Sequence, residues 1–461
     1  MITKIEIDGF KSFSQFEMEF TPLTVIAGTN ASGKSNLFDA LHLLASLTSH
    51  DLRTAFSDKS LRGEVSELFT KYDDQHCATR MNFAVEMLVE RHVTDNWEST
   101  AEIKTPRMRY ELSIERRTNE LGYDELTVAH EQLSNIKYAD DAWAKSILGN
   151  KNKNIWGSGN RGGGGGKPYI ATIEENGLST IRMRQDGKQG GKSIRANVVN
   201  QTVLGSVNSV DFPHVFAAKQ EMNKWNFMQL NPEMLREPTR YDVNYTGSTI
   251  GHAGENLAAA LFRLKSENEE NLDGIVLKLS SFLPEYTKLD VKDDKANKQF
   301  VFTLENSDGT VFTSRVLSEG TLRLLVLCVL LNDKKFQGLL CFEEPENGIH
   351  PYRLEAMAQL LRSLAADFEE GEETSLRQVI VNTHSPALLQ LFYDMSKEGK
   401  GMNIWFSRLV TRITSIGDHR YTLRISKVTP LLDSPQYTIP IEEHKWTYAD
   451  AMRFLNKENT K

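Results

Sequence analysis

The first 45 residues carry three patterns of hydrophobic and polar positions, and each pattern is typical of a different element. Residues 2–10 and 16–20 alternate between polar and apolar side chains, which predicts two half-buried strands. Residues 23–26 are dominated by apolar side chains, as expected for a strand buried on both faces. Leucines then recur at helical spacing, which predicts a helix with one apolar face, at Leu37, Leu41 and Leu44.

The same patterns divide the remaining chain into β-rich and helical stretches. Alternation between residues 79 and 131 predicts an antiparallel meander, and a hairpin is expected at 169–173 and 180–184. Residues 213–284 are mainly helical in pattern, without the sustained heptads of a coiled coil. A further strand is expected at 299–304, before a turn at Asp308 and Gly309.

The composition is that of a globular protein with substantial cores. The chain has 461 residues, 39% of them hydrophobic, which is enough for two or three domain-sized units. No signal-peptide pattern opens the sequence, and the longest apolar run, 324–331, is too short to span a bilayer. The three cysteines lack the spacing of a metal site. We therefore expect a cytoplasmic protein without a membrane partner.

Charge is distributed unevenly along the chain. The net charge of −8 argues against a surface coated for nucleic-acid binding, although it leaves room for a local patch. Residues 151–200 carry nine Lys or Arg and three acids, a local charge of +6. Two interpretations stay open, a solvated loop-rich surface or a contact to a phosphate backbone. Five consecutive glycines at 162–166 predict a mobile segment there.

The junction between the buried strand and the first helix has the spacing of a phosphate-binding loop, Gly28-x-x-x-x-Gly33-Lys34-Ser35. Its glycines let backbone N–H groups curl round a β-phosphate, and the helix start adds partial positive charge. Lys34 is expected to reach the β- and γ-phosphates, and Ser35 to hold Mg²⁺. A chance match is the alternative, but both flanks favour an ATP site. Residues 190–193 look similar but lack the first glycine and the strand, so we interpret them as a polar loop.

Two later apolar strands also end in polar residues that suit such a site. Glu343 and Glu344 close an apolar run that begins at residue 338, where one acid can join a metal shell and the other can activate water. The run at 379–381 precedes His384, which is well placed to sense a γ-phosphate. A histidine at a strand end is more often a hydrogen-bonded residue without a catalytic role. The other motifs of this chain favour a catalytic role for His384.

A second potential anion site lies further along the chain. Ser318 and Gly320 precede the apolar helix expected at 322–331, and a Ser-x-Gly turn at a helix start favours anions. The chain already has one phosphate loop. The second site is therefore most useful if it closes over a nucleotide bound by another subunit.

Together these residues resemble the ATP-binding-cassette ATPases, in particular the SMC and RecF-like head branch. The segments that carry the resemblance are 7–13, 28–36, 254–257, 317–321, 343–351 and 383–384. The resemblance implies an α/β fold, an ABC/SMC-head-like P-loop ATPase with a mixed sheet core, an antiparallel β-rich lobe and a helical lid or insert. Within that branch the chain is most similar to the ATPase subunits of bacterial anti-phage systems such as Septu and PARIS.

The resemblance also implies a homodimer or higher oligomer, with ATP and Mg²⁺ sandwiched between the heads of two subunits. Lys34 and Ser35 would act from one chain, Ser318 and Gly320 from the other, and residues 346–350 would line the contact. The implied site residues are catalytic Glu344 and His384, metal-binding Ser35 and Glu343, and nucleotide-binding Lys11, Gly28, Asn30, Ser32, Gly33, Lys34, Ser35, Asn36, Ser318 and Gly320.

The sequence departs from the family pattern at three places. Glu343 stands where the metal-shell acid is usually Asp, so its contact to Mg²⁺ is expected to be less direct. Glu319 stands at a position that is often Gly. No glutamine is clearly assigned to the loop that senses Mg²⁺, and Gln132 is the candidate.

Three segments are expected: an N-terminal ATPase lobe at 1–135, a variable insert at 136–250 and a C-terminal ATPase lobe at 251–461. The predicted function is an ATPase whose dimer senses or grips nucleic acid, with DNA as one option, or a phage component. It would control a separate effector, a nuclease, in anti-phage defence, because residues 385–461 show no acidic pair with metal-site spacing. A RecF-like DNA-repair ATPase and an ATP-switched scaffold with little turnover are the alternatives.

Overall fold

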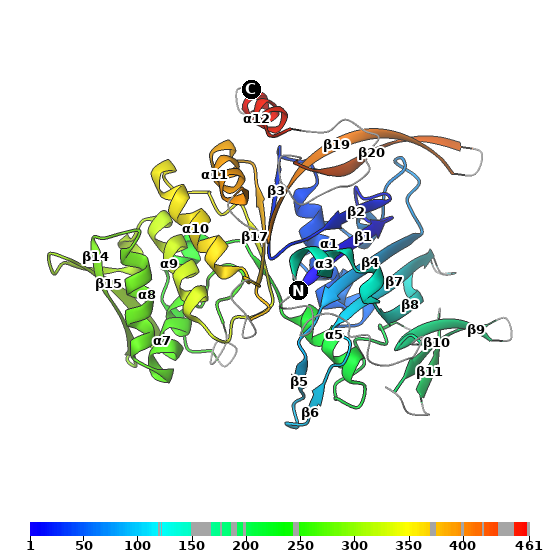
Figure 1. Ribbon diagram of the computed structural model, residues 1–461, viewed down its shortest axis with the longest axis horizontal. Helices are drawn as coiled ribbons and strands as arrows, with labels where there is room; N and C mark the ends of the chain where they lie inside the picture. Colours follow the sequence, from blue (N-terminus) through cyan, green and yellow to red (C-terminus); the bar gives the residue numbers. More distant parts are fainter. Residues whose placement is uncertain are drawn as a thin grey trace.

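The computed structural model describes residues 1–118, 120, 122–148, 167–175, 178–185, 191–196, 200–242, 249–368, 375–397, 401–416, 419–431 and 447–458. A sheet that contains β3 and β17 runs between a helix-rich lobe and a lobe built on an antiparallel sheet (Figure 1). The glycine run at 162–166 lies outside the described residues, as do Lys151, Lys153, Arg161 and Lys188 of the basic segment.

The central sheet has six strands in the order β12, β17, β18, β3, β19, β20. The first five are parallel, and β20 returns antiparallel to β19. The strands are β12 Trp225–Met228, β17 Leu339–Glu343, β18 Gln378–Thr383, β3 Leu23–Gly28, β19 Met402–Ile416 and β20 His419–Pro430. The three predicted apolar strands are confirmed as β17, β18 and β3. The sequence pattern misses β12, whose four residues lie within a stretch that is otherwise mainly helical.

The two faces of this sheet pack against different groups of helices because strand side chains alternate between faces. On β3, Ile26 joins the core that contains helix α1 (Lys34–Ser46), whereas Val25 joins the core that contains α9 (Glu319–Asn332). Helix α5 (Pro213–Asn223) also packs on the α1 face. The other face carries α7 Leu257–Glu267, α8 Glu270–Ser280, α10 Leu354–Leu364, α11 Pro386–Ser396 and α12 Tyr448–Glu458.

The antiparallel lobe is an eight-stranded sheet in the order β11, β10, β9, β8, β7, β4, β1, β2. Its strands are β1 Ile2–Asp8, β2 Phe16–Glu19, β4 Arg80–Leu88, β7 Arg107–Thr118, β8 Asp124–Asn135, β9 Ile170–Glu175, β10 Leu178–Arg184 and β11 Gly191–Arg195. The predicted meander and hairpin are confirmed. The interpretation of residues 190–193 as a loop is wrong, because 191–193 pair with β10 in β11.

The remaining elements complete the two lobes. In the helix-rich lobe, the strand expected at 299–304 is confirmed as β15 (Gln299–Asn306), and it pairs with β14 (Tyr286–Asp294), which the sequence pattern did not predict. The shorter elements are β5 His92–Thr94, β6 Thr100–Glu102, β13 Thr239–Arg240, β16 Val311–Thr313, α2 Leu52–Phe56, α3 Ala142–Ile147, α6 Pro232–Arg236, and 3-10 turns at Val65–Leu68, Tyr138–Asp140, Ser314–Val316 and Pro351–Arg353. None of the helices in the described ranges has both the length and the apolar character to cross a membrane.

The predicted fold class is confirmed: the chain is α/β, with a mixed core sheet, an antiparallel β-rich lobe and a helical lobe. The division into three segments stays a prediction. In the structure, β12 from the segment 136–250 and β3 from the segment 1–135 both join strands of the segment 251–461 in one sheet.

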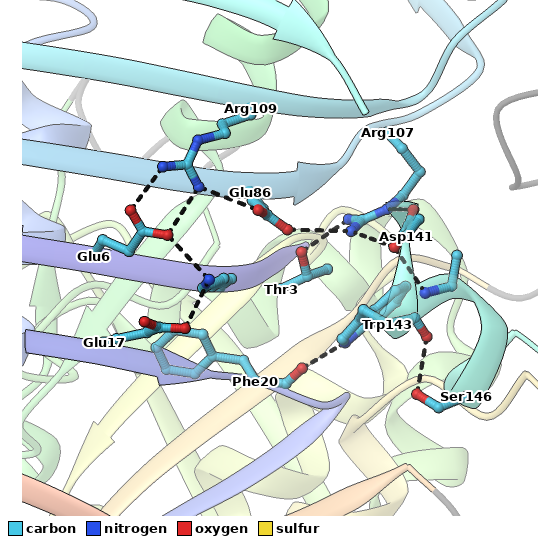
Figure 2. Close-up of polar contacts among 12 residues, drawn as sticks. Thr3, Glu6, Glu17, Phe20, Glu86, Arg107, Arg109, Asp141, Trp143 and Ser146 are labelled. Atoms are coloured by element: carbon cyan, nitrogen blue, oxygen red, sulfur yellow. Dashed lines mark hydrogen bonds and ion pairs between the residues drawn. The ribbon is translucent and has the colours of Figure 1, made fainter. Parts of the chain in front are cut away.

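A buried ion pair attaches α3 to the N-terminal strands (Figure 2). The fully buried Arg107 of β7 donates two hydrogen bonds to Asp141, at 2.7 and 3.1 Å, and one to Thr3 Oγ1 at 2.8 Å. Its guanidinium also lies 4.9 Å from the ring centre of Trp143, whose indole donates to Phe20 O at 2.6 Å. Because Asp141 caps α3 as well, the pair fixes where this helix begins.

A second buried carboxyl connects the antiparallel sheet to the end of α1. Glu131 on β8 accepts hydrogen bonds from the backbone N–H groups of Val203 and Leu204, at 2.7 and 2.8 Å. In the same turn Thr202 donates to Leu47 O, just after α1. Burial raises the pKa of Glu131 to about 7, although the hydrogen bonds that it accepts oppose this shift.

This pKa predicts a pH-dependent stability. A carboxyl whose pKa is higher in the folded than in the unfolded protein stabilises the fold below its unfolded pKa and loses that contribution as pH rises through the folded value. The free energy of unfolding of the wild type, minus that of Glu131→Gln, should fall by about 3 kcal/mol from pH 4.5 to pH 7. Urea unfolding across this range measures the difference. Glu174 is exposed, so the control Glu174→Gln should show the same change of unfolding free energy with pH as the wild type. A difference between wild type and Glu131→Gln that does not change with pH would contradict the prediction.

Candidate functional site

The carboxyl ends of the parallel strands bring the predicted site residues to one edge of the central sheet. In register, Glu343 of β17 lies opposite Asn382 of β18, and Thr383 lies opposite Ala27 of β3. Gly28 in turn lies opposite Ser407 of β19. Ligands of open α/β sheets bind in the crevice beyond these strand ends. The motifs near residues 30, 343 and 384 are therefore assembled in space, although more than 300 residues separate the first from the second.

The phosphate loop ends in a helix start that has no side-chain cap. Gly33 occupies the N-cap position with φ 92, and no side chain bonds the first N–H groups of α1. The loop also holds Ala31 at φ 59. Uncapped N–H groups at a helix N-terminus are donors for an anion. The buried hydroxyl of Ser32 has no hydrogen-bond partner among the described atoms, so the loop fits a phosphate group. Asn30 is exposed and Ser35 is half-buried.

Lys34 lies inside the loop with its ammonium group bonded to neutral oxygens. Its Nζ donates to Gly28 O and to Thr29 O, each at 2.7 Å. Burial lowers the pKa of Lys34 to about 8, and the nearby carboxylates of Glu344, Glu346 and Glu343 oppose this shift. A phosphate would give the ammonium a charged partner in place of carbonyl oxygens.

Two serines of the C-terminal strands close the outer side of the phosphate loop. Ser407 of β19 donates to Ser32 O at 3.0 Å, and its carbonyl lies 2.5 Å from where a side chain on Gly28 would begin. Ser426 of β20 occupies the space where a Cβ on Gly33 would stand. Both glycines are thus required by close approach of β19 and β20, in addition to the positive φ of Gly33.

The predicted base and the predicted γ-phosphate sensor are in contact. His384 Nδ1 lies 3.3 Å from Glu344 Oε1, within ion-pair distance but without hydrogen-bond geometry. Glu344 itself has φ 44, a left-handed conformation that costs a non-glycine residue about 1 kcal/mol. Its N–H donates to both oxygens of Asn382, at 3.0 and 3.1 Å, and Asn347 donates to its carboxylate at 2.8 Å. Asn382 therefore fixes the Glu344 backbone at the edge of the sheet, and Asn347 holds the carboxylate.

Glu346 differs from its implied place at the subunit contact. Its side chain is 7% exposed and accepts from Thr383 Oγ1 at 2.5 Å and from the backbone N–H of His384 at 3.3 Å. Its carboxylate therefore faces into its own chain, where it fixes the end of β18. The neighbouring Asn347 and His350 are exposed, as a contact residue should be.

Lys11 is bonded to an acid of α1 that the sequence motifs do not reveal, and its role in nucleotide binding stays a prediction. Its Nζ donates to Asp39 at 2.6 Å and to Arg62 O at 2.7 Å. The Arg62 guanidinium lies between two carboxylates, 3.3 Å from Asp39 Oδ1 and 3.6 Å from Glu343 Oε1. Arg62 thus reaches the predicted metal-shell acid. The leucine spacing gives no signal for Asp39, because it is two residues from both Leu37 and Leu41 and so lies on the other side of α1, where it is nevertheless buried.

A glutamine at the sheet edge replaces Gln132 as the candidate for the Mg²⁺-sensing position. Gln132 lies on β8 of the antiparallel sheet, opposite Glu111. Gln229 directly follows β12, and its position in the parallel register is beside Glu343, since Met228 pairs with Phe342. Gln229, Glu343 and Arg62 line a pocket of about 460 Å³ with Asp39, His42, Lys59, Ser60, Phe38, Phe227, Met228 and His252. Recognising Gln229 required the strand that the sequence pattern missed.

Ser318 and Gly320 form the start of α9 rather than part of the phosphate loop. Ser318 caps the helix through the Thr321 N–H at 3.2 Å, and a Cβ on Gly320 would lie 3.5 Å from Gly348 O. Within the described residues, no hydrogen bond or ion pair connects either residue to 28–36. Glu319, at the position that is often glycine, pairs with Arg323 at 2.8 Å and lies over Gly348.

The residues fit a nucleotide with a divalent cation, although the protein atoms alone do not form a metal cage. The described residues contain no group of three His, Cys, Asp or Glu side chains that could hold a metal ion. Mg²⁺ in nucleotide sites is held by one or two protein oxygens and completed by phosphates and water. Ser35 and Glu343 suit that partial set, and their role as metal ligands stays a prediction.

Comparisons with known proteins agree with this geometry. Residues 1–158 match a family model described as "AAA ATPase domain", and residues 211–390 match one described as "AAA domain, putative AbiEii toxin, Type IV TA system". The comparison with curated proteins finds no match. The two family matches support the prediction of a nucleotide-binding ATPase and cover every predicted site residue.

Several solved structures are similar to the chain. They are an SMC head domain from Thermotoga maritima (12% identity, 93% of this chain and 98% of that chain, TM-score 0.37), the Smc head domain of Pyrococcus furiosus bound to the C-terminal domain of ScpA (13%, 99% and 99%, 0.41) and the Smc head domain of Pyrococcus yayanosii with a coiled coil and joint (12%, 99% and 99%, 0.43). With TM-scores between 0.37 and 0.43, these similarities do not indicate a function.

The close approach of β20 predicts that Gly33→Ala abolishes nucleotide binding. The added methyl group would overlap Ser426 and would also sit at a strained φ of 92. Binding of a fluorescent ATP analogue measures the effect. Gly309→Ala is a matched control, because its φ is +84 and nothing lies within 4 Å of the added Cβ. It should cost about 1 kcal/mol of stability and leave ATP affinity unchanged. Equal losses in both variants would contradict a specific role for the loop.

Proposed function

We propose that this chain is a Mg²⁺-dependent ATPase that hydrolyses ATP to ADP and phosphate between two copies of itself. The observation that carries the proposal is the parallel register of β3, β18 and β17. It brings the uncapped phosphate loop, the Glu343–Glu344 pair and His384 to one edge of the sheet. This set supplies an anion site, a metal-shell carboxylate and a general base in one place.

The proposed chemistry follows from the contacts of each side chain. Lys34 would exchange its two carbonyl partners for β- and γ-phosphate oxygens and neutralise part of their charge. Glu344 would take a proton from the attacking water, while Asn347 holds its carboxylate and Asn382 holds its backbone N–H. His384 would contact the γ-phosphate from beside Glu344. Bound Mg²⁺ would offset the remaining phosphate charge.

The position of α9 supports a site shared between subunits. Helices α1 and α9 pack on opposite faces of the central sheet, so the Ser318 turn and the phosphate loop are not joined within one chain. Val316, two residues before Ser318, is 67% exposed, and Tyr352, four residues after the Gly348 that faces Gly320, is 71% exposed. Exposed apolar groups beside an unused anion site favour contact with a second copy of the chain.

A cytoplasmic role in anti-phage defence is the biological context we propose, as in the Septu and PARIS systems that the motifs resemble. The dimer would respond to nucleic acid or a phage component and control a separate effector, a nuclease. The toxin and type IV system named in the description of one matching family are compatible with this context. Sensitivity of a deletion strain to DNA damage rather than to phage would favour the RecF-like repair alternative.

The proposed base predicts that Glu344→Gln lowers ATP turnover at least about 100-fold, because general-base catalysis contributes roughly that factor. ATP should still bind, so the variant should accumulate as an ATP-bound dimer in light scattering. Glu355→Gln, an exposed residue of α10, is the control and should turn over like the wild type. Unchanged turnover in Glu344→Gln would instead favour an ATP-switched scaffold, or another base.

The shared site predicts that two inactive variants complement each other. Lys34→Ala and Ser318→Arg should each abolish turnover alone, because every site of either homodimer carries the defect. In an equimolar mixture half of the dimers are mixed, and one of their two sites combines the intact halves. Turnover should therefore recover to about a quarter of the wild-type value if the sites are independent. A mixture no more active than its components would contradict sharing.

A further inference from the structure

The β19–β20 hairpin is basic although the chain as a whole is acidic. Between residues 402 and 430 the sequence has five Lys or Arg and one acid, Asp418, which lies outside the described residues. The net charge of the whole chain is −8. In Figure 1 the hairpin extends over the antiparallel lobe, past β2. A local positive charge on an acidic protein indicates an electrostatic contact with an anionic partner.

Strand register divides these cations between two faces of the hairpin. Arg412 pairs with Leu423, and Arg408 pairs with Lys427, so all three cations share one face with the buried Leu423. Arg424 pairs with Thr411 on the opposite face. In an antiparallel pair, directly opposed residues point to the same side and the next pair points to the other.

The face that carries Arg408, Arg412 and Lys427 borders a groove. The groove has a volume of about 650 Å³ and lies between the hairpin and the segment 14–17. We call it the hairpin groove, lined by Ser14, Gln15, Phe16, Glu17, Arg408, Val410, Thr411, Arg412, Ile425, Ser426, Lys427 and Val428. Its only acid among these residues, Glu17, is paired with Lys4 at 2.7 Å. The lining side chains therefore include three cations and one acid.

We propose that the hairpin groove binds the sugar–phosphate backbone of duplex DNA. Three cations and the neutral hydroxyl of Ser14 are groups that contact phosphate oxygens. Arg412 already donates to Gln15 at 2.8 Å, which holds its guanidinium in the groove and leaves other N–H donors for a phosphate. Single strands are bound largely by stacking on aromatic rings. The only aromatic lining residue, Phe16, is 5% exposed, so the groove favours a duplex.

The groove also shares a residue with the nucleotide site. Ser426 lines the groove, and its hydroxyl is hydrogen-bonded to Ser12 at 2.7 Å and fills the space above Gly33. Asn36 on α1 donates to the same Ser12 at 2.8 Å. DNA in the groove and nucleotide in the loop would therefore both contact the group formed by Ser12, Asn36 and Ser426. If DNA changes the affinity for nucleotide, nucleotide must change the affinity for DNA by the same factor. This inference deepens the proposed function, because it names the surface through which DNA reaches the ATPase site.

The test is fluorescence anisotropy of a labelled duplex, measured at several salt concentrations with Arg412→Glu and Arg424→Glu. The two substitutions change the net charge equally on adjacent positions of one hairpin, but only Arg412 faces the groove. Arg412→Glu should weaken binding about 10-fold and reduce the salt slope by about one, as loss of a phosphate contact does. Arg424→Glu should change affinity less than about 2-fold. Thermal unfolding confirms that both variants fold.

The same anisotropy assay gives the outcomes that would overturn the proposal. Equal losses in the two variants, or no loss in Arg412→Glu, would overturn the groove as the binding surface. Displacement of the duplex by a single strand of equal length, or by polyglutamate at equal charge, would overturn the preference for duplex DNA. ATP turnover without DNA is measured in parallel on the wild type and Arg424→Glu. Absent turnover with an intact Arg412 effect would refute the proposed ATPase but not the groove.

Discussion

Parallel pairing of β17, β18 and β3 is the constraint on which the site depends. Backbone hydrogen bonds fix which strand ends are neighbours, and burial on both faces fixes the register, since a shift by one residue would exchange the faces. Ile26, Cys341 and Ile380 face the α1 core, whereas Val25 and Phe342 face the α9 core. With that register set, the residues that follow each strand can only meet at one edge.

How much of this site the sequence predicts depends on how local each signal is. The phosphate loop and the Glu343–Glu344 pair are local, because each follows an apolar strand within a few residues. Gln229 is not, since β12 has four residues and its assignment as a strand comes from pairing with β17 more than 100 residues away. Arg62 lies in the loop between α2 and the 3-10 turn at Val65–Leu68, and only its distance to Glu343 reveals its place in the site.

The charges at the sheet edge explain why ATP would need a divalent cation here. Glu343, Glu344 and Glu346 all lie close enough to Lys34 to raise its pKa against the effect of burial. A triphosphate would add negative charge beside these carboxylates, and Lys34 with Arg62 cannot balance all of it. A cation shared between the phosphates and an acid removes this repulsion and replaces it with attraction. Glu346 acts on Lys34 as well, although its carboxylate is bonded to Thr383 and to the His384 N–H.

The phosphate loop is completed by residues about 400 positions later in the chain. Ser426 donates its N–H to Ser12 O, and Ser407 donates to Ser32 O, so β19 and β20 fix the loop from outside. Such long-range contacts form late, because closing a long stretch of chain costs entropy before any contact repays it. The loop can therefore reach its final shape only after the hairpin has docked. Because Gly33 has no free space on the side that Ser426 occupies, a ligand that moved the hairpin would also have to move the loop.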